Sequence, residues 1–273
     1  MNTNFNIRQT LECGQVFRFC EPTPHTFRII AQNNFGIYNE ETDNNLDEYN
    51  EFWYNYFDGE TDYSQIKKVL SSKDEHMKNA VEFGGGIRIL KQDPWEMLIS
   101  FIISQNNGIP NIKKSIENIC AKYGSKNQMH GEDYYAFPTV EQLVLATNEG
   151  LRECKVGFRD KYILDACAKV SDGTIDLNQI YNMNSDDARE YLMQISGVGP
   201  KVSDCILLFA YKKNDIFPTD VWIKRVMEGL YFNGEEQSLK KIKDFALDYY
   251  GDLAGYAQQY LFYYARENQL FKK

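Results

Sequence analysis

The sequence is most constrained by a helix break at residues 197–200. The preceding stretch, residues 185–195, carries apolar side chains at helical spacing and begins with Ser185-Asp186-Asp187, a pattern typical of a helix start. Gly197-Val198-Gly199 interrupts this helix, and Pro200 suits the first position of the next one, which we expect over 200–212. The sequence therefore predicts two helices joined by a glycine hairpin, about residues 185–212, whose second helix presents free backbone N–H groups to a phosphate.

Two ionisable residues after the glycine turn occupy positions suited to chemistry. Lys201 lies in the first turn of the second helix, where the positive helix end and apolar surroundings would both favour the neutral amine that a nucleophile requires. Asp220, 19 positions later, precedes Val221 as a helix N-cap does. The alternatives are a surface lysine that contacts phosphate and an aspartate that only caps a helix. A carboxylate held in place by capping also suits the stabilisation of a positive charge that develops during a reaction.

This segment resembles the helix-hairpin-helix and Gly-Pro-Asp signature of base-excision DNA glycosylases. Lys201 and Asp220 match the lysine and the aspartate that perform the chemistry in that family. The resemblance implies that Gly197 and Gly199 let the hairpin approach DNA. It also implies a monovalent cation, potassium or sodium, that bridges to phosphate and is held by the backbone carbonyls of Met193, Ile195 and Val198.

The segment Cys13-Gly14-Gln15-Val16-Phe17-Arg18 resembles the 8-oxoguanine branch of the same family, where a glycine offers its backbone carbonyl to the damaged base. Guanine has an acceptor at N7, whereas 8-oxoguanine has an N–H there. A carbonyl at Gly14 would therefore bond the lesion and repel the normal base. The alternative is a turn glycine that leads into a strand.

A base-recognition pocket is implied by three further residues. Gln258 and Phe262 are four positions apart and share a face of the helix expected over 254–270. They match the family's amide that reads the Watson–Crick edge and its aromatic ring that stacks on the base. Cys205, four positions after Lys201, matches the opposite wall of the pocket, so a flipped base would lie between Cys205 and Phe262. Without the resemblance, a phenylalanine at this spacing is expected in the core.

Contacts with the opposite strand are implied at two loops, with two departures from the family. Asn106 matches the asparagine that fills the gap left in the duplex, although its position also suits a helix C-cap. Phe158 and Arg159 match a wedge and an arginine that reaches the opposite base, where a tyrosine commonly stands in place of Phe158. Asn111 occupies the place of a second arginine, which predicts a relaxed preference for cytosine. Trp222 replaces a histidine.

The net charge of −9 is distributed unevenly along the chain. Residues 1–60 hold ten acidic and three basic residues, whereas residues 199–225 hold five basic and three acidic ones. Phosphate contact can therefore be local, with hairpin amides replacing part of the positive charge, and we expect weak non-specific affinity for DNA.

The hydrophobic pattern changes near residue 80. Residues 16–19 and 26–30 alternate with period two and predict an antiparallel sheet, whereas Asp93 and Pro94 open a run of helices. We predict an α+β fold, with an N-terminal antiparallel sheet domain at 1–85 and a larger helical domain at 86–273. Gly84-Gly85-Gly86 indicates a helix C-cap or a linker. Helices are expected over about 111–123, 139–148, 159–170, 185–195, 200–212, 220–231, 238–250 and 254–270.

Metal sites and membrane segments are not predicted. The cysteines form no Cys-x-x-Cys pair, and His25, His76 and His130 lie far from them, so we expect no zinc, no iron–sulfur cluster and no required organic cofactor. The first residues lack the apolar core of a signal peptide, and the apolar run at 206–210 is too short to cross a bilayer. We expect an intracellular monomer, in the cytoplasm, nucleoid or nucleus.

The resemblance implies a bifunctional 8-oxoguanine DNA glycosylase/AP lyase whose partner is double-stranded DNA containing 8-oxoguanine. One alternative is a monofunctional alkylated-base glycosylase of the same fold, but the lysine at position 201 argues against it. The other is a non-catalytic helix-hairpin-helix module that only binds DNA, but the presence of Asp220 and of the Gln258/Phe262 pair argues against it.

Overall fold

The computed structural model describes residues 4–129 and 131–271. His130 and the first three residues, which entered the metal and signal-peptide predictions, lie outside the described residues. The chain folds into two compact units built from separated segments. The first unit contains the described residues of Met1–Gln15, Glu40–Lys91 and Lys212–Lys273, and the second contains those of Val16–Asn39 and Gln92–Tyr211. The division into domains at residue 85 stays a prediction.

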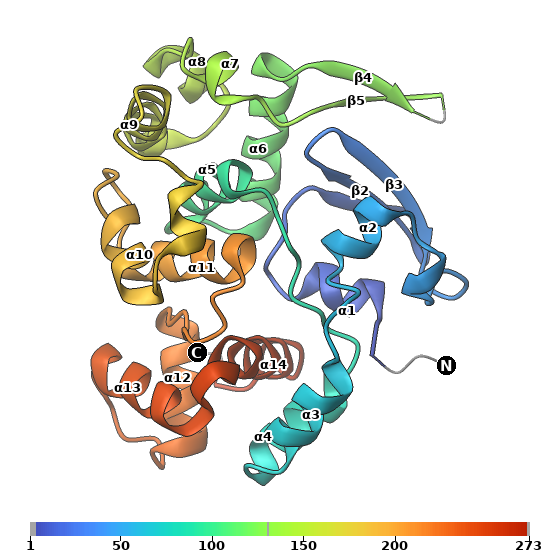
Figure 1. Ribbon diagram of the computed structural model, residues 1–273, viewed down its shortest axis with the longest axis vertical. Coiled ribbons are helices and arrows are strands. Elements are labelled where there is room, and N and C mark those ends of the chain that lie inside the picture. Colours follow the sequence, from blue (N-terminus) through green and yellow to red (C-terminus); the bar gives the residue numbers. More distant parts are fainter. Residues whose placement is uncertain (1–3, 130, 272–273) are drawn as a thin grey trace. The chain divides into compact units, whose positions relative to one another are not determined.

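The predicted antiparallel sheet lies in the second unit (Figure 1). Strands β1 (Phe19–Thr23), β2 (Thr26–Ala31) and β3 (Asn34–Asn39) pair in that order. The central strand β2 buries Phe27, Ile29 and Ala31 and leaves the residues between them partly exposed. This is the alternation that a sheet with one covered face requires.

Apart from the two-stranded β4–β5 sheet, helices form the rest of the second unit, and α5 lies at its centre because it packs against α6, α9 and α11. Asp93 caps α5 by accepting a hydrogen bond from the Glu96 N–H at 2.8 Å, and Pro94 takes the first helical position, as predicted. The elements of this unit are α5 (Pro94–Ser104), α6 (Ile109–Tyr123), β4 (Lys126–Met129), β5 (Glu132–Tyr135), α7 (Val140–Leu143), α8 (Asn148–Glu153), α9 (Asp160–Ser171), α10 (Ser185–Leu192) and α11 (Pro200–Tyr211).

The first unit is helical, and its longest helix, α14, packs against α4, α12 and α13. Gly84 is the C-cap of α4, which confirms the prediction for the triple glycine. The helices of this unit are α1 (Ile7–Glu12), α2 (Glu51–Tyr56), α3 (Tyr63–Ser71), α4 (Glu75–Phe83), α12 (Val221–Tyr231), α13 (Leu239–Tyr250) and α14 (Ala254–Glu267).

The sheet-plus-helix class is confirmed, but three details differ from the prediction. Residues 1–85 contain α1–α4 as well as the sheet, and the β4–β5 hairpin interrupts the helical part of the chain. The helix expected over 139–148 is wrong, because two short helices, α7 and α8, replace it. The Thr147 side chain accepts a hydrogen bond from the Gly150 N–H at 3.1 Å and so begins a new helix at Asn148.

Candidate DNA-repair active site

The hairpin between α10 and α11 requires glycine at one of its two positions. Gly197 has φ +80°, and a Cβ there would lie 2.4 Å from the ring of Tyr162 on α9. A side chain at this position is therefore excluded by the backbone conformation and by space. Gly199 differs, because a Cβ there would have no neighbour within 4 Å among the described residues. Its small size leaves the start of α11 open.

Helix α9 fixes the hairpin through charge-assisted hydrogen bonds. The Asp165 carboxylate accepts from the Ser196 N–H at 2.7 Å and from Lys169 Nζ at 2.9 Å, and Lys169 also donates to the Gln194 carbonyl at 2.7 Å. Although partial burial acts to raise the pKa of Asp165, these hydrogen bonds lower it overall. The carboxylate therefore stays charged and holds the turn that leads into α11.

Lys201 occupies the first turn of α11, as predicted. Its Nζ lies 5.5 Å from the centroid of the Phe101 ring, which in turn stacks on Phe209 at 5.6 Å. Cys205 follows one turn later and is buried. The predicted nucleophile thus lies beside an aromatic cluster and on the same helix as the predicted wall of the base pocket.

The predicted wedge and opposite-strand residues lie on connected segments of the second unit. Phe158 is 52% exposed and packs edge-to-face against Tyr162, the residue that contacts Gly197. Arg159, by contrast, is buried and donates to the carbonyls of Gln105 and Asn106. In this structure Arg159 therefore fastens the loop that presents Asn106.

Asn106 and Asn111 flank the start of α6, and both are exposed. Asn106 has φ +47° just after the end of α5, so it has the left-handed conformation of a residue that ends a helix. Asn111 lies in the first turn of α6. The structure thus presents both amide side chains to solvent from neighbouring segments.

The first unit contains the predicted base-recognition residues. Gly14 has φ +87°, and a Cβ there would lie 3.0 Å from Cε1 of Phe262, so the glycine loop and α14 are in close contact. Gln15 anchors the same loop, because its side chain donates to the carbonyls of Thr10 at 2.9 Å and Arg88 at 2.8 Å and accepts from the Leu90 N–H at 2.9 Å. The Gly14 carbonyl therefore belongs to a loop that is held before any ligand arrives.

Gln258 is buried on α14, and its amide is oriented by its neighbour. Gln259 Nε2 donates to Gln258 Oε1 at 2.7 Å. Gln258 and Phe262 therefore lie on α14, which contacts the Gly14 loop within the first unit. Their role in a base pocket stays a prediction.

Asp220 is the N-cap of α12, as predicted. Its Oδ1 accepts from the Ile223 N–H at 2.8 Å, and Oδ2 makes no hydrogen bond with the described residues. Trp222 lies in the first turn of α12, and its indole Nε1 is buried without a hydrogen-bond partner in the described part of the chain. Capping fixes one carboxylate oxygen of Asp220 and leaves the other for a second role.

Several residues that support these sites carried no recognised signal in the sequence. Tyr162 and Asp165 contact the hairpin only through tertiary packing, so no local pattern identifies them. Arg266 donates to the Glu12 carbonyl and lies near Phe262. It follows Gln258 and Phe262 at the same four-residue spacing, so extending that pattern by one turn would have found it.

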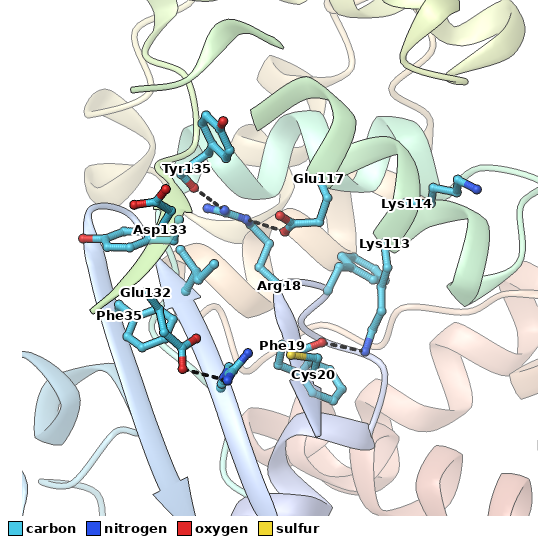
Figure 2. A pocket seen from close by; sticks show the side chains of 14 residues that line it. Arg18, Phe19, Cys20, Phe35, Lys113, Lys114, Glu117, Glu132, Asp133 and Tyr135 are labelled. Carbon is cyan, nitrogen blue, oxygen red and sulfur yellow. Dashed lines mark hydrogen bonds and ion pairs between the residues drawn. The ribbon is translucent and has the colours of Figure 1, made fainter. Parts of the chain in front are cut away.

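A pocket of about 430 Å³ lies in the second unit, apart from the predicted site residues (Figure 2). Arg18 reaches from the segment before β1 to Glu117 of α6, at 3.1 Å, and to the carbonyl of Tyr135 on β5, at 2.5 Å. These bonds join three elements around the pocket. The lining residues are Phe17, Arg18, Phe19, Cys20, Arg28, Ile30, Phe35, Lys113, Lys114, Glu117, Glu132, Asp133, Tyr134 and Tyr135.

Metal-binding clusters and membrane-spanning helices are both absent from residues 4–129 and 131–271. No group of three or more His, Cys, Asp or Glu side chains in these ranges is arranged to hold a metal ion. No helix in the same ranges is long and apolar enough to cross a membrane.

The glycine hairpin, the lysine at the start of its second helix and the capping aspartate define a helix-hairpin-helix DNA repair protein. Residues 1–98 match the N-terminal domain of 8-oxoguanine DNA glycosylases, and residues 99–249 match the helix-hairpin-helix Gly-Pro-Asp superfamily of base excision DNA repair proteins. The chain belongs to this superfamily and, within it, to the 8-oxoguanine DNA glycosylase family.

Individual relatives agree with this assignment. The Clostridium acetobutylicum 8-oxoguanine glycosylase/lyase, solved with double-stranded DNA containing cytosine opposite 8-oxoguanine, is 44% identical with a TM-score of 0.92; the match covers 98% of this chain and 93% of that one. MBOgg1, solved with a low-affinity DNA ligand, is 45% identical with the same TM-score, over 97% and 93% of the two chains. A probable N-glycosylase/DNA lyase of Methanothermobacter thermautotrophicus is 35% identical over 74% of this chain and 70% of its own length.

Proposed function

We propose that this protein is a bifunctional DNA glycosylase/AP lyase that excises 8-oxoguanine from duplex DNA and then cleaves the strand. The observation that carries the proposal is Lys201 in the first turn of α11, directly after a glycine hairpin held by α9 and beside the Phe101 ring. The hairpin suits a DNA phosphate, and the lysine suits covalent attack on the sugar attached to it.

In the proposed reaction, the damaged nucleotide is flipped out of the duplex and the Lys201 amine attacks its C1′ atom. The bond between C1′ and the base breaks, its electron pair leaves with the base, and the base takes up a proton. Asp220 stabilises the positive charge that develops on the sugar. The amine then loses a proton and the sugar ring opens to a Schiff base. Removal of a C2′ proton expels the 3′ phosphate by β-elimination, which cuts the strand.

Recognition of the lesion is assigned mainly to residues of the first unit, together with Cys205 of the second unit. The Gly14 carbonyl accepts a hydrogen bond from N7–H of 8-oxoguanine and faces an acceptor in guanine, which has no hydrogen there. Gln258 reads the Watson–Crick edge, and Phe262 and Cys205 stack on the two faces of the base. The fixed position of the glycine loop supports this assignment, because discrimination by an unpaired polar group depends on a carbonyl that cannot turn away.

Duplex contacts are assigned to segments of the second unit, together with Trp222 of the first unit. Phe158 inserts into the base stack, Asn106 fills the gap, and Arg159 and Asn111 lie nearest the orphaned base. The hairpin glycines Gly197 and Gly199 approach the backbone, with Trp222 as a further DNA contact. The backbone carbonyls of Met193, Ile195 and Val198 would hold a potassium or sodium ion, which would supply positive charge for a DNA phosphate.

Two rival functions make different predictions. A monofunctional alkylated-base glycosylase would release its base without forming a covalent intermediate, and Lys201 would then have no chemical role. A hairpin module that only binds DNA would leave Asp220 and the Gln258/Phe262 pair without function.

One experiment separates the three functions. Duplexes carrying a single 8-oxoguanine, a single alkylated purine, an abasic site or no lesion are incubated with the protein and borohydride. We expect a trapped covalent adduct with the 8-oxoguanine and abasic duplexes alone. Release of the alkylated base without an adduct would support the monofunctional rival, and binding without release or adduct would support the DNA-binding module.

A further inference from the structure

We propose that Arg266 is a positioning residue for recognition of the damaged base, because one guanidinium holds both the Gly14 loop and the Phe262 ring. This inference rests on the proposed function, in which those two groups contact 8-oxoguanine. It adds a residue that neither the family signature nor the sequence pattern assigned.

Arg266 lies on the recognition face of α14. Gln258, Phe262 and Arg266 are spaced by four residues, so their side chains lie above one another along one side of the helix. The guanidinium carbon of Arg266 is 5.5 Å from the centroid of the Phe262 ring, within the range of a cation–π contact. The aromatic ring that would stack on the base therefore has a charged group over it.

The same guanidinium binds the end of α1. Arg266 Nη2 donates to the carbonyl of Glu12, the last residue of α1, which precedes Gly14 by two positions. Carbonyls at a helix end lack intrahelical partners and carry partial negative charge, so a guanidinium is a favourable partner for them. This bond holds the chain immediately before the glycine, while Gln15 holds it immediately after.

Gly14, the Phe262 ring and the Arg266 guanidinium lie close together. A Cβ placed on Gly14 would lie 3.0 Å from Cε1 of Phe262 and 3.9 Å from Nη1 of Arg266. The planar guanidinium has donors on several edges, so it can bond a carbonyl with one nitrogen while its body lies against a ring. A lysine at this position would supply a single ammonium and would keep one of these two contacts at most.

A matched pair of variants tests this role. Arg266→Gln removes both the positive charge and the planar guanidinium with its several donors. Arg266→Lys keeps only the positive charge. Arg8→Gln is the control, because Arg8 is another arginine of the first unit, lies on α1 and pairs with the carboxylates of Glu12, at 3.5 Å, and Glu40, at 2.9 Å. Each protein is assayed by single-turnover cleavage of an 8-oxoguanine duplex and of an abasic duplex, which has no base to recognise.

We expect Arg266→Gln to slow 8-oxoguanine excision about 10-fold, the effect of losing one hydrogen bond to a charged group, while abasic cleavage changes less than about twofold. The excision rate of Arg266→Lys should lie between those of Arg266→Gln and the wild type. Arg8→Gln should cleave both duplexes at the wild-type rates. Equal losses on the two duplexes would show a general structural role and overturn the inference, as would full excision by Arg266→Gln. A wild-type protein that does not excise 8-oxoguanine would instead overturn the proposed function itself.

Discussion

At the scale of single residues, the structure assigns a structural contact to side chains for which the sequence predicted a chemical role. Asp220 caps α12 through Oδ1, and Arg159 binds the carbonyls of the loop that carries Asn106. The cap was predictable because capping depends on local sequence. The contacts of Arg159 were not, because they join segments more than 50 positions apart.

The two roles of Asp220 can be separated with Asp220→Asn. Asparagine caps helices nearly as well as aspartate, so the variant should fold with little change in its thermal midpoint. It lacks the fixed negative charge, so turnover on the 8-oxoguanine duplex should fall about 100-fold or more. Single-turnover excision checks this, and turnover equal to that of the wild type would reduce Asp220 to a helix cap.

Asn111 predicts how the protein treats the base opposite the lesion. A bidentate arginine contact to a base discriminates by about 1 to 3 kcal/mol, which the short neutral Asn111 cannot supply. We expect excision of 8-oxoguanine opposite all four bases with a narrow spread, and Asn111→Arg should widen the spread in favour of cytosine by about 10-fold or more. Four duplexes that differ only in the opposite base provide the measurement. If the wild type already rejects the other three bases by several orders of magnitude, another residue reads the orphaned base.

At the scale of elements, the helices with strong end signals were predicted well. Pro94 and Pro200 with their neighbouring caps and glycines placed the start of α5 and the bounds of α10 and α11 within a few residues. The β4–β5 hairpin was missed because residues 126–135 are polar and show no alternation of period two. The support that α9 gives the hairpin was also unpredictable, since Tyr162 and Asp165 act through tertiary contacts.

The hairpin glycines should respond differently to the same substitution. Gly197→Ala places a side chain at φ +80° and against the Tyr162 ring, so it should lower the free energy of unfolding by at least about 1 to 2 kcal/mol. Gly199→Ala meets open space and should change stability by less than about 0.5 kcal/mol. Denaturant unfolding of both variants measures the difference. Equal effects would mean that α9 does not constrain the turn.

At the scale of the whole molecule, each unit is assembled from segments that are distant in the sequence. The chain passes from the first unit to the second directly after Gly14 and Gln15, and Lys201 and Asp220 belong to different units. Periodicity and motif spacing predicted the elements and the chemistry of these residues. They did not predict the grouping, because which segments pack together is decided by long-range contacts such as those of Arg18 and Gln15.

The buried carboxyl group of Glu96 makes stability depend on pH. Burial is the main reason that the pKa of Glu96 is raised from 4.5 to about 7, and the charge of Arg18 opposes this rise only in part. The folded state therefore binds a proton more tightly than the unfolded state. Its contribution to stability is complete below about pH 4.5 and is lost as pH rises through 7.

Glu96→Gln should remove this dependence. Between pH 5 and pH 8 the free energy of unfolding of the wild type should fall relative to that of the variant, by on the order of 2 to 3 kcal/mol. Denaturant titrations of both proteins at several pH values check the difference, and parallel curves across this range would show that Glu96 does not titrate as described.

The central claim is that Lys201 is the nucleophile, and the most direct test maps the covalent adduct. The wild-type protein is trapped on an 8-oxoguanine duplex with borohydride, digested and analysed by mass spectrometry, and Lys201→Gln is treated in parallel. The account predicts that the nucleotide is attached to Lys201, and that Lys201→Gln still binds the lesion duplex but forms no adduct. An adduct on another residue, or one that persists in Lys201→Gln, would contradict it.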